Sequence, residues 1–119
     1  MLRKMLRSKL HRALVTDANL EYEGSITIDS DLLLQADMAE YEQVQVVNLN
    51  NGERFETYII SGEAGSGDIQ LNGAAARLAH PGDRIIIMNY TMIDDRDLDG
   101  WKPKILLLDS KNRIKESLC

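Results

Sequence analysis

The 119 residues, 44% hydrophobic and 28% charged, predict one globular domain over residues 1–119 that can bury its own core. No apolar run approaches the roughly 20 residues of a membrane span, and the net charge of −5 argues against nucleic acid as a partner, because such binders present basic faces. The only cysteine is Cys119, so we expect neither a disulfide scaffold nor a metal site, and a reducing, cytoplasmic setting fits.

The first segment, MLRKMLRSKLHRALV at residues 1–15, has its apolar residues at 2, 5, 6, 10, 13 and 14. This periodicity by itself favours an amphipathic basic helix. The next pattern, SITID at 25–29, alternates as a short strand does. Asp29 or Ser30 can then cap a brief helix over 31–36, because a side-chain oxygen there accepts from first-turn N–H groups.

The middle of the chain predicts short strands separated by turns. VQVVNL (44–49) and RFETYII (54–60) read as strands joined by a hairpin turn at 50–53 that carries an Asn-Gly pair. Further strands are expected at 69–71, 84–90 and 104–109, with a glycine-rich loop at 63–68, an Ala-rich helix at 72–80 and a turn at 80–83. This order indicates a mainly β protein, a small barrel with short helices.

Residue spacing alone identifies no catalytic or metal-binding motif. His11 and His80 lie far apart and match no metal-ligand spacing. The loop EAGSGD lacks the GK[ST] ending of a phosphate-binding loop and is better explained as a turn. Composition and spacing therefore predict a β domain without an assigned function.

Four segments in order change this interpretation: KLHRA at 9–13, YEGS at 22–25, NGERFETY at 51–58 and NGAAA at 72–76. Together they resemble the pyruvoyl-dependent aspartate 1-decarboxylase family, which makes β-alanine for pantothenate synthesis. The resemblance extends to about residue 90, and the tail from Thr91 matches poorly. It implies a double-psi β-barrel, a homotetramer with active sites between subunits, and a strand rather than a helix at the N-terminus. We follow the resemblance on that last point.

The resemblance further implies that the chain cleaves itself at Gly24-Ser25 into a β-chain (1–24) and an α-chain (25–119). The residues suit this chemistry, because a serine hydroxyl can attack the preceding carbonyl carbon through a five-membered ring. A planar trans peptide resists that distortion, and glycine removes a Cβ that would crowd it. Elimination and hydrolysis would then leave a covalent pyruvoyl group at residue 25, which forms a Schiff base with the substrate amine.

Roles for individual residues are likewise implied by the resemblance. Thr57 matches the residue that assists self-cleavage and contacts substrate, and Tyr58 matches the proton donor. The implied substrate contacts are Lys9 and Arg54, which carry the needed positive charge, and the segment Asn72, Gly73, Ala74 and Ala75. His11 and Tyr22 are expected in the pocket. We assign Arg54 to the β-carboxylate of L-aspartate, because its planar fork suits bidentate binding.

Two other interpretations stay open at this point. The chain could be a non-enzymatic β-barrel binding module in which Gly24-Ser25 remains intact, or a pyruvoyl decarboxylase of a different substrate such as glutamate. The sequence also does not distinguish spontaneous maturation from maturation assisted by a helper protein.

Overall fold

The computed structural model describes residues 1–118 and is mainly β, as the sequence predicts. Cys119, on which the prediction about disulfides depends, lies outside the described residues. Nine strands and three short helices follow in the order β1 (Leu2–Leu14), β2 (Asp17–Asn19), β3 (Ser25–Asp29), α1 (Ser30–Ala36), β4 (Gln43–Asn48), β5 (Arg54–Gly62), β6 (Ile69–Asn72), η1 (Gly73–Arg77), β7 (Arg84–Asp94), η2 (Asp95–Asp97), β8 (Lys104–Leu108) and β9 (Ile114–Leu118).

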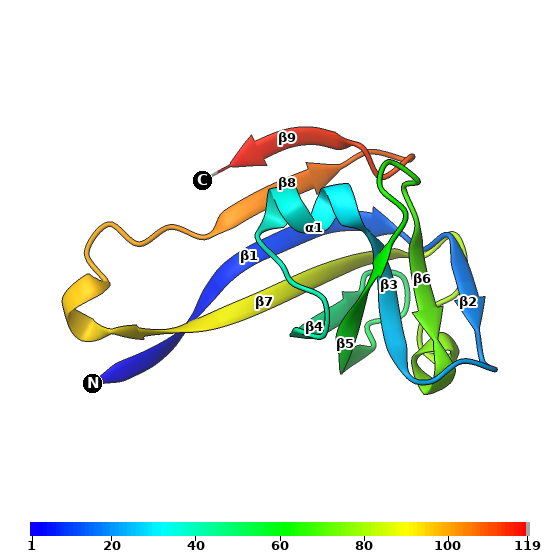
Figure 1. The fold of residues 1–119 in the computed structure, drawn as a ribbon, viewed down its shortest axis with the longest axis horizontal. Helices are drawn as coiled ribbons and strands as arrows, with labels where there is room; N and C mark the ends of the chain where they lie inside the picture. The colour runs from blue at the N-terminus through cyan, green and yellow to red at the C-terminus, as the bar shows by residue number, and fades with distance from the viewer. Residues whose placement is uncertain (119) are drawn as a thin grey trace.

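All nine strands belong to one curled sheet in the order β2-β6-β3-β5-β4-β7-β1-β8-β9 (Figure 1). Most neighbours are antiparallel, but β3–β5, β2–β6 and β1–β8 are parallel pairs that require crossovers. The curl encloses an apolar core whose fully buried side chains include Leu10, Ile26, Ile28, Val44, Val46, Ile59, Ile69, Leu71, Ile85, Ile87 and Leu106. This architecture fits the small β-barrel that the resemblance implies.

The N-terminal segment is a strand, so the helical periodicity was misleading and the resemblance was right. The reason is visible in the pairing of β1 with β7, where the register shifts between Leu6 and Ser8 and again between His11 and Ala13. Each bulge inserts one residue and interrupts the alternation of side chains between the two faces. At the second bulge Arg12 has φ of 64°. Two interruptions spread the apolar residues into a spacing that resembles a helix.

Most other predicted elements are confirmed. Asp29, rather than Ser30, caps α1 and accepts from the N–H of Asp31 at 2.8 Å. The segment at 72–80 is less helical than expected, since only η1 forms, as a single 3₁₀ turn. The strand predicted to end at residue 90 continues to Asp94, while β2, η2 and β9 have no counterpart in the sequence prediction.

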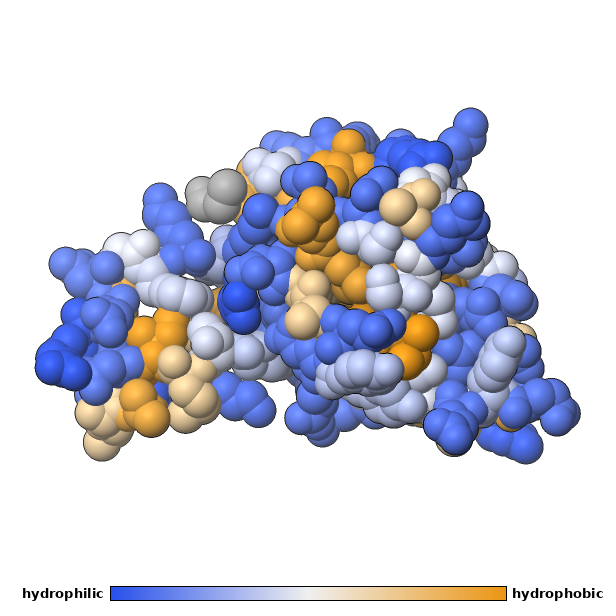
Figure 2. Space-filling view, viewed as in Figure 1, coloured by the Kyte–Doolittle hydropathy of each residue, from blue (hydrophilic) through white to orange (hydrophobic). Residues whose placement is uncertain are grey.

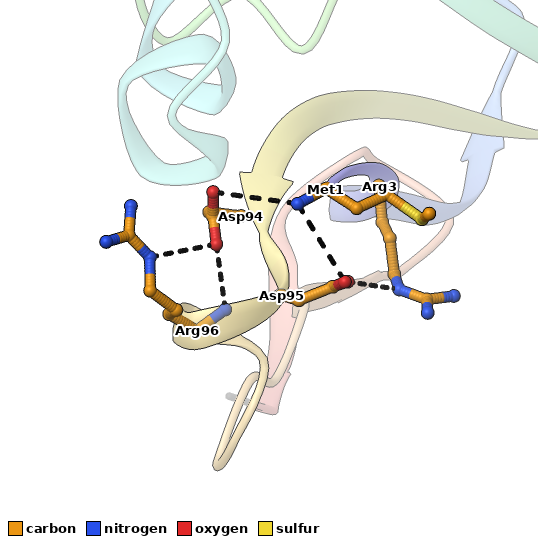
Figure 3. A network of polar contacts seen from close by, with 5 residues as sticks. All are labelled: Met1, Arg3, Asp94, Asp95 and Arg96. Atoms are coloured by element: carbon orange, nitrogen blue, oxygen red, sulfur yellow. Dashed lines mark hydrogen bonds and ion pairs between the residues drawn. The ribbon is translucent and has the colours of Figure 1, made fainter.

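The extension of β1 and β7 forms a two-stranded ribbon that reaches away from the rest of the sheet (Figure 1). Its far end is closed by charges: the N-terminal amino group lies 3.9 Å from a carboxylate oxygen of Asp94 and of Asp95 (Figure 3). Arg3 pairs with Asp95 at 2.5 Å, and Arg96 pairs with Asp94 at 3.0 Å. These ion pairs hold the start of β1 against the end of β7.

The turn between β8 and β9 is hydrogen-bonded to two other segments of the chain. Asn112 is buried, and its Nδ2 donates to the carbonyl oxygens of Leu14 (2.9 Å) and Gly67 (2.7 Å), while its Oδ1 accepts from Leu14 N at 2.7 Å. The tail therefore belongs to the domain and ties the end of β1 to the loop before β6.

The surface in Figure 2 is mostly hydrophilic, with apolar side chains in small separate patches. Within residues 1–118, no helix combines the length and the apolar character required to cross a membrane.

Candidate active site

Ser25 opens β3 and is buried, although the residues before it, 21–24, are exposed. Its register partner on the antiparallel strand β6 is Asn72. The Nδ2 of Asn72 donates to Ser25 Oγ at 2.9 Å, and Oγ in turn donates a long bond of 3.4 Å to the carbonyl oxygen of Glu23. The hydroxyl is thus held in place at the point where an exposed loop enters a buried strand.

A cavity of about 580 Å³ adjoins this hydroxyl. Its walls come from the loop before β3 and from one face of β3, β5 and β6, and its lining residues are Glu21, Tyr22, Glu23, Ser25, Thr27, Tyr58, Ile60, Gln70 and Asn72. The two predicted residues Tyr22 and Tyr58 lie here with Ser25. The charged residues among the lining are acids, and none of the lining residues is a lysine or an arginine.

A second hollow of about 320 Å³ lies beside the first and contains Gly24. Thr57, Ala74 and Ala75 line it, and Tyr58 borders both hollows. Thr57 does not line the first cavity, because adjacent strand residues point to opposite faces and that cavity takes Tyr58 and Ile60 from β5. The residues on the two sides of the Gly24-Ser25 peptide bond therefore line different cavities.

The backbone of the loop at residues 22–24 packs closely against Gly73. Gly73 has φ of +65°, and a Cβ at this position would lie 2.7 Å from Gly24 N and 2.7 Å from Tyr22 O. Only glycine permits this approach. A Cβ at Gly24, in contrast, would meet no atom within 4 Å outside its chain neighbours, so packing in the intact chain does not explain the glycine there.

Lys9, His11 and Arg54 do not line the cavity beside Ser25. Lys9 and His11 lie on β1, four places from β3 in the sheet order. Arg54 begins β5, four residues before Tyr58, which corresponds to roughly 13 Å along a strand. One chain thus brings together the serine, the tyrosines and the 72–75 segment, and leaves the predicted cations elsewhere.

His11 lies on β1, opposite Ile86 of β7 and Leu107 of β8, and is only partly exposed. Its Nδ1 is buried and has no hydrogen-bond partner within residues 1–118. Burial lowers the pKa of His11 from its ordinary value of 6.5, and the positive charges of Lys9 and Arg12 lower it further. The imidazole is accordingly biased toward its neutral form.

Sequence reasoning missed Thr27 and Gln70, which line the cavity. Both could have been found from strand alternation, because Thr27 is two residues after Ser25 and Gln70 is two residues before Asn72. Glu21 and Glu23 were also missed. Within the described part of the chain, no group of three or more acidic, histidine or cysteine side chains is placed to hold a metal ion.

Comparison with known proteins gives consistent results. A family model described as aspartate decarboxylase matches residues 1–115. The aspartate 1-decarboxylase of Ralstonia nicotianae is 60% identical over 116 residues, which cover 98% of this chain and 97% of the relative. That of Acetivibrio thermocellus is 59% identical (92% and 87% covered), and that of Bacillus cytotoxicus is 58% identical (99% and 93% covered).

These matches correct one expectation. The resemblance does not stop near residue 90, since the family model extends to residue 115, through β8 and into β9. The tail matched poorly because few of its residues carry chemistry, and the structure shows that it pairs β8 with β9 and bonds Asn112 to Leu14 and Gly67. The match over nearly the whole chain places this protein in the aspartate decarboxylase family.

Proposed function

We propose that this protein decarboxylates L-aspartate to β-alanine and CO₂, the step that supplies β-alanine for pantothenate, after cleaving itself at Gly24-Ser25. Membership of a family whose named relatives are aspartate 1-decarboxylases supports the reaction. The observation that carries the proposal is the placement of Ser25, a buried hydroxyl held by Asn72 at the wall of a 580 Å³ cavity.

Self-cleavage begins when Ser25 Oγ attacks the carbonyl carbon of Gly24. The Gly24-Ser25 C–N bond breaks, the amine takes a proton, and an ester joins Gly24 to Oγ. Loss of the proton from Cα of residue 25 and cleavage of its Cβ–Oγ bond release Gly24 as a carboxylate. Water then replaces the nitrogen of the resulting dehydroalanine, and ammonia leaves. Thr57, which shares a hollow with Gly24, supplies a hydrogen-bond donor to the Gly24 oxygen as negative charge develops there.

The surroundings of residue 25 fit a pyruvoyl group formed there. The cavity offers room for a small amino acid beside Ser25, and the Gly73 contact keeps the 22–24 backbone against η1. A pyruvoyl ketone supplies an electrophile for the substrate amine and accepts electron density as CO₂ leaves. Asn72 presents an amide to the same position, and Ala74 and Ala75 present small side chains beside the adjoining hollow.

Tyr58 is the proton donor in this proposal. It lines the cavity that contains Ser25, and its ring packs near that of Tyr41 with centroids 6.5 Å apart. Its phenol O–H is a proton source that can deliver a proton to the substrate carbon once CO₂ has left.

The substrate's charge requires residues from a second copy of the chain. Aspartate carries two carboxylates, yet the charged side chains around the cavity are Glu21 and Glu23. One cation at about 4 Å contributes roughly 4 kcal/mol of Coulomb attraction at an effective dielectric of 20. We therefore place Lys9 and Arg54 of a neighbouring subunit at the cavity, in a homotetramer, with Arg54 on the β-carboxylate. His11, two residues after Lys9 on β1, would approach the same region.

The intact mass of the purified protein tests this proposal, together with assays of aspartate and glutamate. Wild type is expected as chains of 24 and 95 residues with β-alanine formation, and Ser25→Ala as one inactive chain. A single wild-type chain without decarboxylase activity would support the alternative of a binding module. A cleaved protein that turns over glutamate and not aspartate would overturn the substrate assignment.

A further inference from the structure

Four polar residues form a compact patch on one wall of the cavity. Ser25 and Thr27 lie on β3, opposite Asn72 and Gln70 on β6, and these two directly opposed pairs face the same side of the sheet. The residues between them, Ile26 and Leu71, point to the other side and are fully buried in the core. The strand register therefore fixes the four side chains relative to one another.

The Asn72 carboxamide is engaged at every polar atom. Its Nδ2 donates to Ser25 Oγ at 2.9 Å and to Thr27 Oγ1 at 3.0 Å, which uses both N–H groups. Its Oδ1 accepts from Gln70 Nε2 at 3.0 Å. Asn72 is 4% exposed, so little water can substitute for a lost partner.

We propose that Gln70 and Thr27 are positioning residues for self-cleavage, because they hold the Asn72 carboxamide with its Nδ2 on Ser25 Oγ. This inference rests on the proposed cleavage at Gly24-Ser25. A hydroxyl has one proton and two lone pairs. With the proton directed to Glu23 O and one lone pair occupied by Asn72, the remaining lone pair has a defined direction for attack on the Gly24 carbonyl carbon.

The same hydrogen bond assists the second half of the reaction. When the Cβ–Oγ bond breaks, Oγ leaves as part of the Gly24 carboxylate and takes the bonding electron pair. The Nδ2 donor of Asn72 already points at this oxygen and stabilises its developing charge. Gln70 and Thr27 touch none of the reacting atoms and act through Asn72.

The test follows conversion of one chain into two over time, after cell-free synthesis of each variant. Gln70→Met removes the amide that holds Oδ1 and keeps the volume, and Thr27→Val removes the hydroxyl and keeps the shape. Each is expected to slow cleavage by about fivefold or more, the effect of one lost hydrogen bond in a buried network. Thr27→Ser, which keeps the hydroxyl, is expected to restore the rate, and Gln35→Glu on the exposed side of α1 serves as the control.

Repeating Gln70→Met in an Asn72→Ala background distinguishes positioning of Asn72 from a general structural role. If Gln70 acts through Asn72, Gln70→Met has no further effect on the cleavage rate once Asn72 is absent. An equal slowing by Gln70→Met with and without Asn72, or equal rates for Thr27→Val and Thr27→Ser, would overturn the inference. If Asn72→Ala does not cleave at all, the comparison of Thr27→Val with Thr27→Ser tests the inference by itself. A wild-type chain that never cleaves would instead refute the proposed function itself.

Discussion

The backbone of Gly24 lies against Gly73, at a distance that leaves no room for a Cβ on residue 73. Gly73→Ala is therefore expected to displace the 22–24 loop and to block or strongly slow self-cleavage. Gly52→Ala is the matched control, since Gly52 has a similar φ of +78° and a Cβ added there would meet no atom within 4 Å outside its chain neighbours. The control should lose about 1–2 kcal/mol of stability from backbone strain alone and still cleave. Normal cleavage of Gly73→Ala, followed on a denaturing gel, would refute the importance of this contact.

Thr57 and Tyr58 should separate formation of the pyruvoyl group from its use, because Thr57 lines only the Gly24 hollow, whereas Tyr58 also lines the Ser25 cavity. Thr57→Val keeps the shape, loses the hydroxyl and should remain one chain. Tyr58→Phe keeps the ring, loses the proton and should give two chains with a much reduced kcat. Parallel gels and β-alanine assays measure both. A fully active Tyr58→Phe enzyme would remove Tyr58 as proton donor, and normal cleavage of Thr57→Val would refute the division.

Arg54→Lys keeps the charge and loses the bidentate fork. We expect self-cleavage to proceed while kcat/KM for aspartate falls by roughly tenfold or more, the effect of one lost charge-assisted hydrogen bond. Arg96→Lys, at the far end of the ribbon, provides a control with the same chemical change. Unchanged kcat/KM in Arg54→Lys would place Arg54 outside the substrate site.

The lowered pKa of His11 predicts a pH dependence of stability. In the unfolded chain His11 titrates near 6.5, so the unfolded state binds a proton at a higher pH than the folded state does. The stability contribution is complete above pH 6.5 and is lost as the pH falls through the lower, folded pKa.

Denaturant unfolding from pH 7.5 to 5, at one protein concentration, measures this effect. The free energy of unfolding should fall more steeply for wild type than for His11→Gln, whereas the exposed His80→Gln should follow wild type. If the free energy of unfolding depends on pH in the same way for wild type and His11→Gln, the predicted contribution of His11 is wrong.

Asn112 should be among the costliest single residues of the tail. Asn112→Ala leaves polar groups of Leu14 and Gly67 without partners, for an expected loss of about 3 kcal/mol. Because Asn112 has φ of 57°, Asn112→Gly removes the same side chain with less backbone strain and should lose less. Thermal or denaturant unfolding measures both losses. A loss below about 1 kcal/mol in the alanine variant would show that the tail does not fasten the sheet.

Most of the local elements and the chemically distinctive residues could be predicted from the amino-acid sequence. Alternation and turn residues located β3, β4, β5 and β6, and the pair Asp29 and Ser30 marked the start of α1, because these signals depend on near neighbours. The motifs around Ser25, Arg54 and Asn72 identified the family for the same reason: they are short and have a fixed order.

Features that depend on pairing between distant segments could not be predicted from the sequence. The bulges of β1 concealed its strand from periodicity, since a bulge is defined against the partner β7. Gln70 and Thr27 come to line the cavity only through the β3–β6 register, and the close contact between Gly73 and Gly24 is visible only in the folded chain. Lys9 and Arg54 match the family motifs yet do not line the cavity. Strand order, which sequence spacing does not encode, puts the β1 residue Lys9 four places from β3, and Arg54 stands at the start of β5, four residues before Tyr58.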